Sequence, residues 1–338
     1  MLRVRSPIRS EMKKLKTWGW VIGLLGLVAC ATPPTLDGAE EVILERLRAV
    51  RACRQEIADV WPGFSDPRYD VPMLYYTDSI CYGVNLPPMF EDSLGARLVH
   101  EEPGLSLYKL PLPDSLPFHM ETTLEFLDST RYNYLRPMIV CSSPEMVVRV
   151  VPDVTSDQAW MPMVLHEYAH GYQYAHGAFC RRVAEALPSH PETELERLHK
   201  RCAWFDRAIR AENETLLDAL ATEDTSLWRA YIQRFLTQRA ARKARMAAEM
   251  GNSAVRDEAF FELMEGMARY IEAEAGFHLG SYTERDTWLY DTDHAGYFFV
   301  TGYNLMRLFD RLGVDKQRFY ADSIRPLELY LRETGVYE

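Results

Sequence analysis

The sequence is poor in basic residues, in closely spaced cysteines and in long apolar runs. Lys and Arg number 38 against 49 Asp and Glu, so the formal net charge is −11. This acidic balance argues against a nucleic-acid partner and against electrostatic adhesion to anionic lipid. No two of the six cysteines are separated by two to four residues, which disfavours a zinc–cysteine cluster. The longest apolar run, residues 18–28, is too short to span a bilayer as a helix.

The first thirty residues have the parts of a bacterial export signal. A basic segment with three lysines precedes the apolar run, which ends in Leu27-Val28-Ala29-Cys30. These four residues resemble the lipobox at which bacterial lipoproteins are cleaved and lipidated. The resemblance implies a signal peptide over residues 1–29, a lipid-anchored Cys30 in the outer membrane, and a tether over residues 30–38. An ordinary secretory signal with an incidental cysteine is the alternative.

Five cysteines remain after such a cleavage. In an oxidising envelope the odd number predicts two disulfides and one free thiol. Cys180 and Cys202 flank one segment, so a bridge between them would clip that loop to the next helix. Cys53, Cys81 and Cys141 would supply one further pair.

Apolar periodicity predicts an α+β region over residues 39–152. Residues 40–61 repeat apolar side chains at helical spacing. The segments 71–76, 135–141 and 146–151 have the composition of strands, and prolines break the chain between them into loops. We therefore expect a small sheet in this region.

Residues 153–338 are predicted to be a mainly helical region. An insert at about 191–251 contains two charged amphipathic runs, and it is either a lid or a structural hairpin of helices. Further helices are expected at about 295–312 and 316–332. The basic residues of the insert, which we expect on a solvated helix face, are Arg234, Arg239, Arg242, Lys243 and Arg245.

The most informative stretch is Val164–His170, which contains an H-E-x-x-H motif. Residues four apart lie one turn apart on the same face of a helix, so His166 and His170 can bind one tetrahedral Zn²⁺. Glu167 adjoins the first histidine and can act as the general base on a metal-bound water. Pro162 falls about one turn into the predicted helix, which either starts or bends there. The residues upstream that favour a helix start are Asp153, Thr155, Ser156 and Asp157.

A third protein ligand has to come from elsewhere in the chain. His176 has the spacing of the third ligand in the H-E-x-x-H-x-x-G-x-x-H pattern of metzincins. Gln173, however, stands where that pattern has the glycine that ends the helix. If the helix continues, His176 lies about 240° around the axis from His170 and faces away from the metal.

A second motif downstream supplies the better candidate. Glu265-Gly-Met-Ala-Arg-Tyr270 resembles the glutamate-ligand motif of gluzincins, the thermolysin-like and collagenase-like zinc peptidases. The resemblance implies that Glu265 is the third ligand of Zn²⁺. Glu262, one turn earlier, is the alternative ligand or a hydrogen-bond partner of an imidazole. The small Gly266 would let the two metal-binding helices approach closely. The sequence departs from thermolysin in the longer separation, 95 residues, between His170 and Glu265.

Gluzincins also need a donor, often a tyrosine or histidine, that stabilises the oxyanion of the tetrahedral intermediate. The candidates near the predicted helix at 295–312 are His294, Tyr297 and Tyr303. We select Tyr297, which shares a helix face with His294.

These features predict a lipid-anchored zinc metallopeptidase in the bacterial cell envelope, acting on a peptide or protein substrate. Zn²⁺ would be bound by His166, His170 and Glu265, with Glu167 as general base and then acid. The alternative is a non-catalytic envelope protein that retains the metal scaffold for binding or assembly. The intact Glu167 argues against that alternative, because metal binding alone does not require a carboxylate there.

Overall fold

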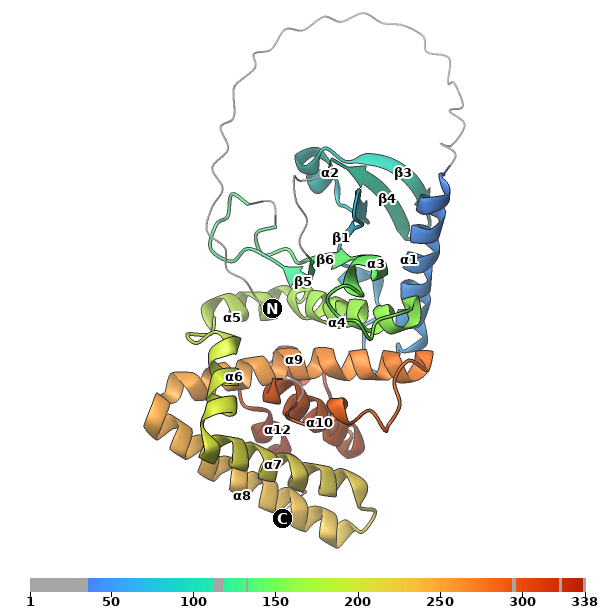
Figure 1. Ribbon diagram of the computed structural model, residues 1–338. Coiled ribbons are helices and arrows are strands. Elements are labelled where there is room, and N and C mark those ends of the chain that lie inside the picture. Colours follow the sequence, from blue (N-terminus) through green and yellow to red (C-terminus); the bar gives the residue numbers. More distant parts are fainter. Residues whose placement is uncertain (1–35, 112–117, 132, 294–295, 322–323, 337–338) are drawn as a thin grey trace, which may run out of the picture.

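The computed structural model describes residues 36–111, 118–131, 133–293, 296–321 and 324–336 (Figure 1). The fold is α+β, as predicted: a six-stranded sheet in the first part of the chain is followed by a mostly helical part. The predicted signal peptide, Cys30 and His294 lie outside the described residues.

The sheet is mixed, with the strand order β3-β4-β2-β1-β6-β5. Its strands are β1 (Met73–Tyr76), β2 (Cys81–Val84), β3 (Arg97–Glu102), β4 (Leu105–Leu110), β5 (Met120–Thr123) and β6 (Met138–Ser142). β1 and β6 are parallel, and the other neighbouring strands are antiparallel. β5 therefore forms one edge of the sheet, and this edge lies against α4 (Asp157–Ala175).

The other helices fall into two groups. Those of the sheet region are α1 (Gly38–Glu56), α2 (Pro88–Leu94), α3 (Pro144–Val147) and the 3₁₀ turn η1 (Pro67–Tyr69). Those after α4 are α5 (Gly177–Glu185), α6 (Glu192–Arg201), α7 (Ala203–Ala221), α8 (Thr225–Met250), α9 (Asn252–Leu279), η2 (Thr287–Leu289), α10 (Tyr297–Leu312), α11 (Arg318–Ala321) and α12 (Leu327–Glu333). No described helix has both the length and the apolarity that crossing a membrane requires.

α4 is the layer that joins the two parts of the molecule. It lies between the sheet and α9, with α7, α8, α10 and α12 on the far side of α9 (Figure 1). Ser156 caps its start, because its side chain accepts a hydrogen bond from the Ala159 amide at 3.2 Å. The helix continues through Pro162 to Ala175, so the proline does not mark its beginning. One hydrophobic core continues from the sheet through α4 into the helices around α9.

Two predicted elements are wrong. Residues 146–151, predicted as a strand, belong to α3 and the turns after it, because Pro144 at the first helical position favours a helix start. The helix predicted over residues 316–332 is divided into α11 and α12. Pro326, which cannot donate to a helical hydrogen bond, stands immediately before α12.

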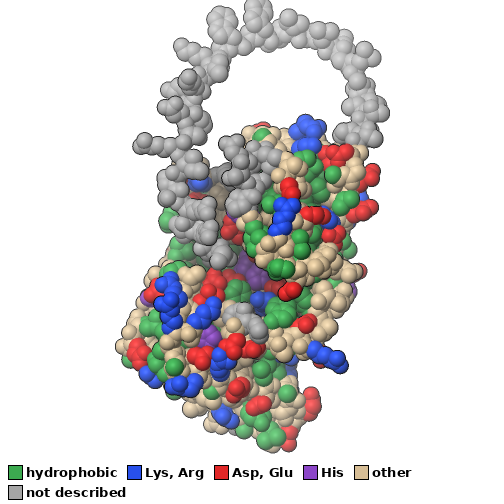
Figure 2. Space-filling model, in the orientation of Figure 1, with side chains coloured by type: hydrophobic (Ala, Val, Ile, Leu, Met, Phe, Trp, Pro, Cys, Tyr) green, Lys and Arg blue, Asp and Glu red, His purple; other side chains and the backbone are tan. Residues whose placement is uncertain are grey.

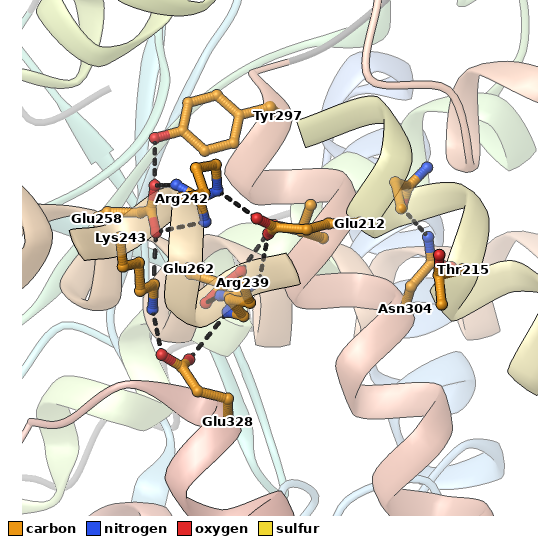
Figure 3. Close-up of polar contacts among 12 residues, drawn as sticks. Glu212, Thr215, Arg239, Arg242, Lys243, Glu258, Glu262, Tyr297, Asn304 and Glu328 are labelled. Atoms are coloured by element: carbon orange, nitrogen blue, oxygen red, sulfur yellow. Dashed lines mark hydrogen bonds and ion pairs between the residues drawn. The ribbon is translucent and has the colours of Figure 1, made fainter. Parts of the chain in front are cut away.

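The helical insert is a structural part of the core, and the expectation of a solvated basic face is wrong for three of its residues. Arg239, Arg242 and Lys243 of α8 are buried in a network of charged side chains (Figure 3). Their carboxylate partners are Glu212 on α7, Glu258 and Glu262 on α9, and Glu328 on α12. Only Arg234 and Arg245 of the five basic residues are exposed.

The structure contains none of the expected disulfides among its described residues. Cys53, Cys81, Cys141, Cys180 and Cys202 are all free thiols. They lie on α1, β2, β6, α5 and the α6–α7 junction, and all but Cys202 are buried. Burial of Cys180 raises its thiol pKa to about 11, which keeps the thiol protonated at neutral pH.

Candidate metal centre

Three side chains from two helices converge between the sheet and the helical part. His166 and His170 come from α4 and Glu265 comes from α9. The two Nε2 atoms are 3.2 Å apart, and Oε2 of Glu265 is 3.4 Å from His166 Nε2 and 3.3 Å from His170 Nε2. Histidine atoms are visible at the middle of the face shown in Figure 2, at the junction of the two parts and beside acidic atoms.

The spacing of these three atoms fits a tetrahedral metal ion. Two ligand atoms that each lie about 2.0–2.1 Å from one tetrahedral ion are about 3.3–3.4 Å apart. All three separations are within about 0.2 Å of that value. Three protein ligands leave one position of the tetrahedron for a water or a substrate atom.

Both imidazoles are oriented by a hydrogen bond at the other ring nitrogen. Nδ1 of His166 lies 2.9 Å from Oε2 of Glu272, and Nδ1 of His170 lies 3.0 Å from Oε1 of Gln173. Each acceptor favours a proton on Nδ1, so that in the neutral ring the Nε2 lone pair can bind a metal ion placed between the two imidazoles and Glu265.

The two acceptors are themselves held in place. The amide nitrogen of Gln173 donates to the Met264 carbonyl at 3.0 Å, which turns Oε1 toward the histidine. Glu272 accepts hydrogen bonds from Arg269 at 3.2 Å and from the Tyr282 hydroxyl at 3.1 Å. The orientation of both imidazole rings is therefore fixed by side chains of α4 and α9 and by Tyr282.

In the absence of a metal, a proton on His166 balances the carboxylates. Burial lowers the pKa of His166, but hydrogen bonds to Glu265 and Glu272 outweigh it and raise the pKa to about 10. Burial raises the pKa of Glu265. The positive charges of His170 and His166, and their hydrogen bonds to the carboxylate, outweigh burial and bring this pKa well below its usual value. These carboxylates favour positive charge beside them, and binding of a metal ion here would release the proton of His166.

Glu167 lies beside this triad and faces the sheet. It is buried, and its Oε2 accepts a hydrogen bond from the hydroxyl of Thr122 on β5 at 3.1 Å. The carboxylate of Glu167 thus lies on the side of α4 that faces the edge strand β5.

Glu262 does not take part in the centre, and its expected role as a ligand or imidazole partner is wrong. Its carboxylate binds Arg239 and, at 2.7 Å, the Thr301 hydroxyl. The imidazole partner on α9 is Glu272, which lies two turns beyond Glu265 on the same face.

His176 lies apart from the triad. α4 continues past Gln173, and the His176 ring stacks between Tyr69 and Tyr320, with centroid distances of 4.2 and 4.6 Å. Its Nδ1 is 2.8 Å from the Tyr172 carbonyl. The metzincin-like arrangement is therefore absent.

Tyr297, selected above as the oxyanion donor, has a different partner. Its ring is buried, and its hydroxyl donates to Glu258 at 2.9 Å within the charged network (Figure 3). Tyr303 is buried among Tyr270, Tyr290 and Arg307. Neither hydroxyl is directed at the triad, because the face of α10 that meets α9 carries them into the core.

Tyr174 is the tyrosine that continues the metal-ligand face of α4, one turn beyond His170. Its ring packs against Phe126 of the loop after β5 at 6.1 Å. Burial raises the pKa of its hydroxyl, and the charges of Glu265 and Glu167 act in the same direction. This hydroxyl therefore stays protonated and is a potential donor beside the centre.

No model of a known protein family, no curated protein and no solved structure matches the chain. The chemistry of the centre therefore has to be inferred from its own geometry.

Proposed function

We propose that the chain is a zinc-dependent peptidase of the gluzincin type. The observation that carries the proposal is the triangle of His166, His170 and Glu265 ligand atoms, 3.2–3.4 Å apart, with both imidazoles oriented from behind. Two histidines and one glutamate are the donor set of a catalytic rather than a purely structural zinc ion, because the fourth position stays open.

The residues around this triad supply the acid–base chemistry of peptide hydrolysis. When bound, zinc would activate a water molecule and polarise the scissile carbonyl as a Lewis acid. Glu167 would take the proton of the attacking water and then deliver it to the leaving amine, so that it ends the cycle as a carboxylate. Tyr174, rather than Tyr297, would donate a hydrogen bond to the developing oxyanion.

The substrate in this proposal is an extended peptide segment bound along β5. β5 is an edge strand, and no other described strand pairs with its outer side. A peptide can add to such an edge through main-chain hydrogen bonds. It would then lie alongside α4 near Glu167, which the Thr122 contact ties to this strand.

The location in this proposal is the bacterial cell envelope, through a lipid on Cys30. It rests on the lipobox-like Leu27-Val28-Ala29-Cys30. We expect Cys30→Ser to abolish incorporation of labelled palmitate in a bacterial host. Retained labelling would contradict the anchor.

The proposal is tested on a soluble form that starts after Cys30. We expect one zinc per chain by elemental analysis in the wild type, in Glu167→Gln and in His176→Ala, and loss of zinc in Glu265→Ala. Peptide-library cleavage followed by mass spectrometry should fall by at least about a hundredfold in Glu167→Gln, because the general base is removed.

Two results would overturn the proposal. Absence of zinc from the wild type after reconstitution would remove the metal centre. Unchanged cleavage by a zinc-loaded Glu167→Gln protein would remove the assigned chemistry and favour a binding protein that retains the metal scaffold.

A further inference from the structure

Thr122 connects the edge strand of the sheet to the residue between the two metal ligands. Its hydroxyl oxygen is 2.7 Å from the main-chain oxygen of Glu167 and 3.1 Å from Oε2 of the same residue. Both residues are buried, with exposed fractions of 8% and 6%. The contact joins residues 45 positions apart in the sequence.

The hydroxyl is not needed to complete the backbone of either element. A carbonyl inside an α-helix already accepts a hydrogen bond from the amide four residues later, so it does not need a second donor. Thr122 pairs through its backbone with Ile139 of β6. The side-chain contact is thus an addition to the regular hydrogen bonds of α4 and β5, and it selects the one residue with a proposed acid–base role.

We propose that Thr122 is a positioning residue that fixes the carboxylate of Glu167 relative to β5 through its hydroxyl; the inference rests on the peptidase function proposed above. A hydroxyl has one proton to donate and two lone pairs with which to accept. While Glu167 is a carboxylate, the Thr122 proton is shared between Oε2 and the main-chain oxygen. When Glu167 takes the proton of the attacking water on Oε1, Oε2 continues to accept from Thr122, and the new proton stays free for delivery to the leaving amine.

The proton balance leaves Thr122 unchanged. The water proton moves to Glu167 and then to the leaving amine, while the threonine proton stays on its own oxygen. Since Thr122 belongs to β5, the strand that would bind the peptide also sets the position of the base. A displacement of about 1 Å between a base and its substrate can cost about a hundredfold in rate.

The test compares Thr122→Val, which removes the hydroxyl at nearly constant size, with Thr122→Ser, which keeps it. Thr215→Val is the matched control, because Thr215 is also buried and its hydroxyl also donates to a main-chain oxygen of a helix, that of Ala211 on α7 at 2.8 Å. In the zinc-loaded soluble protein we expect Thr122→Val to lower kcat about ten- to a hundredfold, with KM nearly unchanged. Thr122→Ser should restore most of the rate, and Thr215→Val should leave it unchanged.

A second measurement does not depend on activity. In protein labelled with ¹³C at the glutamate carboxyl carbons, the Glu167 resonance is assigned by its absence from Glu167→Gln. We expect this resonance to move in Thr122→Val, to return in Thr122→Ser and to stay in place in Thr215→Val. Zinc content should be one per chain in all three variants.

The outcomes separate the inference from the proposed function. An unmoved Glu167 resonance in Thr122→Val, or a wild-type kcat in that variant, would overturn the positioning role. A moved resonance in a protein whose wild type cleaves no peptide would support the contact and overturn the peptidase function. A similar loss of rate in Thr122→Ser would show that the methyl group of Thr122, and not its hydroxyl, supports the rate. That result would also overturn the positioning role of the hydroxyl.

Discussion

At the scale of single residues, the two imidazoles differ in the charge of the group that orients them. His166 faces the carboxylate of Glu272, whereas His170 faces the neutral amide of Gln173. An anionic acceptor makes the imidazole a stronger ligand than a neutral one does. The centre is therefore asymmetric, because only His166 has a charged acceptor at Nδ1.

Glu272→Gln should weaken zinc binding about ten- to a hundredfold, because the substitution keeps the acceptor but removes its charge. The affinity is measured by competition with a chromophoric chelator at neutral pH. Glu274→Gln is the control, since it makes the same charge change on α9 without a hydrogen bond to either histidine. Equal affinity of Glu272→Gln and the wild type would show that the contact only orients the ring.

The sequence predicted the three side chains that converge but not the groups that orient them. His166 and His170 follow from helical spacing, and Glu265 follows from a motif on a second helix. The role of Glu272 could have been predicted from the sequence, since Glu272 lies seven residues after Glu265 on the same helix face. The role of Thr122 could not have been predicted, because β5 was not predicted and the contact with Glu167 joins residues distant in the sequence.

At the scale of elements, Gly266 serves the crossing of α9 with α10 and not the approach of α9 to α4. A Cβ on Gly266 would lie 2.5 Å from the Cα of Gly302, and one on Gly302 would clash with the main-chain oxygen of Glu262. The small residue beside the Glu265 ligand therefore serves the contact with α10. The sequence suggested a close contact at Gly266 but not which helix makes it.

Gly302→Ala should destabilise the protein by about 1–3 kcal/mol, because the added methyl group separates two tightly packed helices. It should also lower zinc occupancy, since α9 carries Glu265. Urea unfolding followed by circular dichroism gives the free energy, and elemental analysis gives the occupancy. Gly38→Ala is the control, because no heavy atom lies within 4 Å of the added group. Wild-type stability of Gly302→Ala would contradict the tight crossing.

Helices and strands were predicted more accurately where their apolar pattern was longer. The helices at 38–56, 157–175 and 225–250 are long enough for their periodicity to dominate. Strands of four to six residues between prolines, such as β2, β3 and β5, gave too short a pattern and were read as loops. Their pairing depends on partners distant in the sequence, which no local pattern contains.

At the scale of the whole molecule, charge is distributed in a way that composition does not reveal. The acidic excess is visible in the sequence, but three of its cations and four of its carboxylates are buried together where α7, α8, α9 and α12 meet (Figure 3). Removing one member of such a network leaves an unpaired buried charge, which costs about 3–5 kcal/mol. The helical part is therefore held together in part by α9, the same helix that carries Glu265.

This network should make stability depend on acid pH. Burial raises the pKa of Glu258, but the charges of Arg242 and Lys243 and the hydrogen bond from Arg242 bring it down to about 2. A carboxyl whose pKa is lower in the folded than in the unfolded state stabilises the fold above the unfolded pKa of about 4.3. That contribution is lost as the pH falls from about 4.3 through about 2. Glu212, whose burial raises its pKa, acts in the opposite direction and offsets part of the effect.

Unfolding free energies of the metal-free protein, measured in urea between pH 7 and pH 3, should therefore fall steadily below about pH 4.5. Glu258→Gln should be less stable at pH 7, because Arg242 and Lys243 lose an ionised partner, and its stability should vary less with pH. Since both proteins keep Glu265 and Glu272, the difference between their pH profiles isolates Glu258 from the carboxylates of the metal centre. Parallel profiles would contradict the lowered pKa of Glu258.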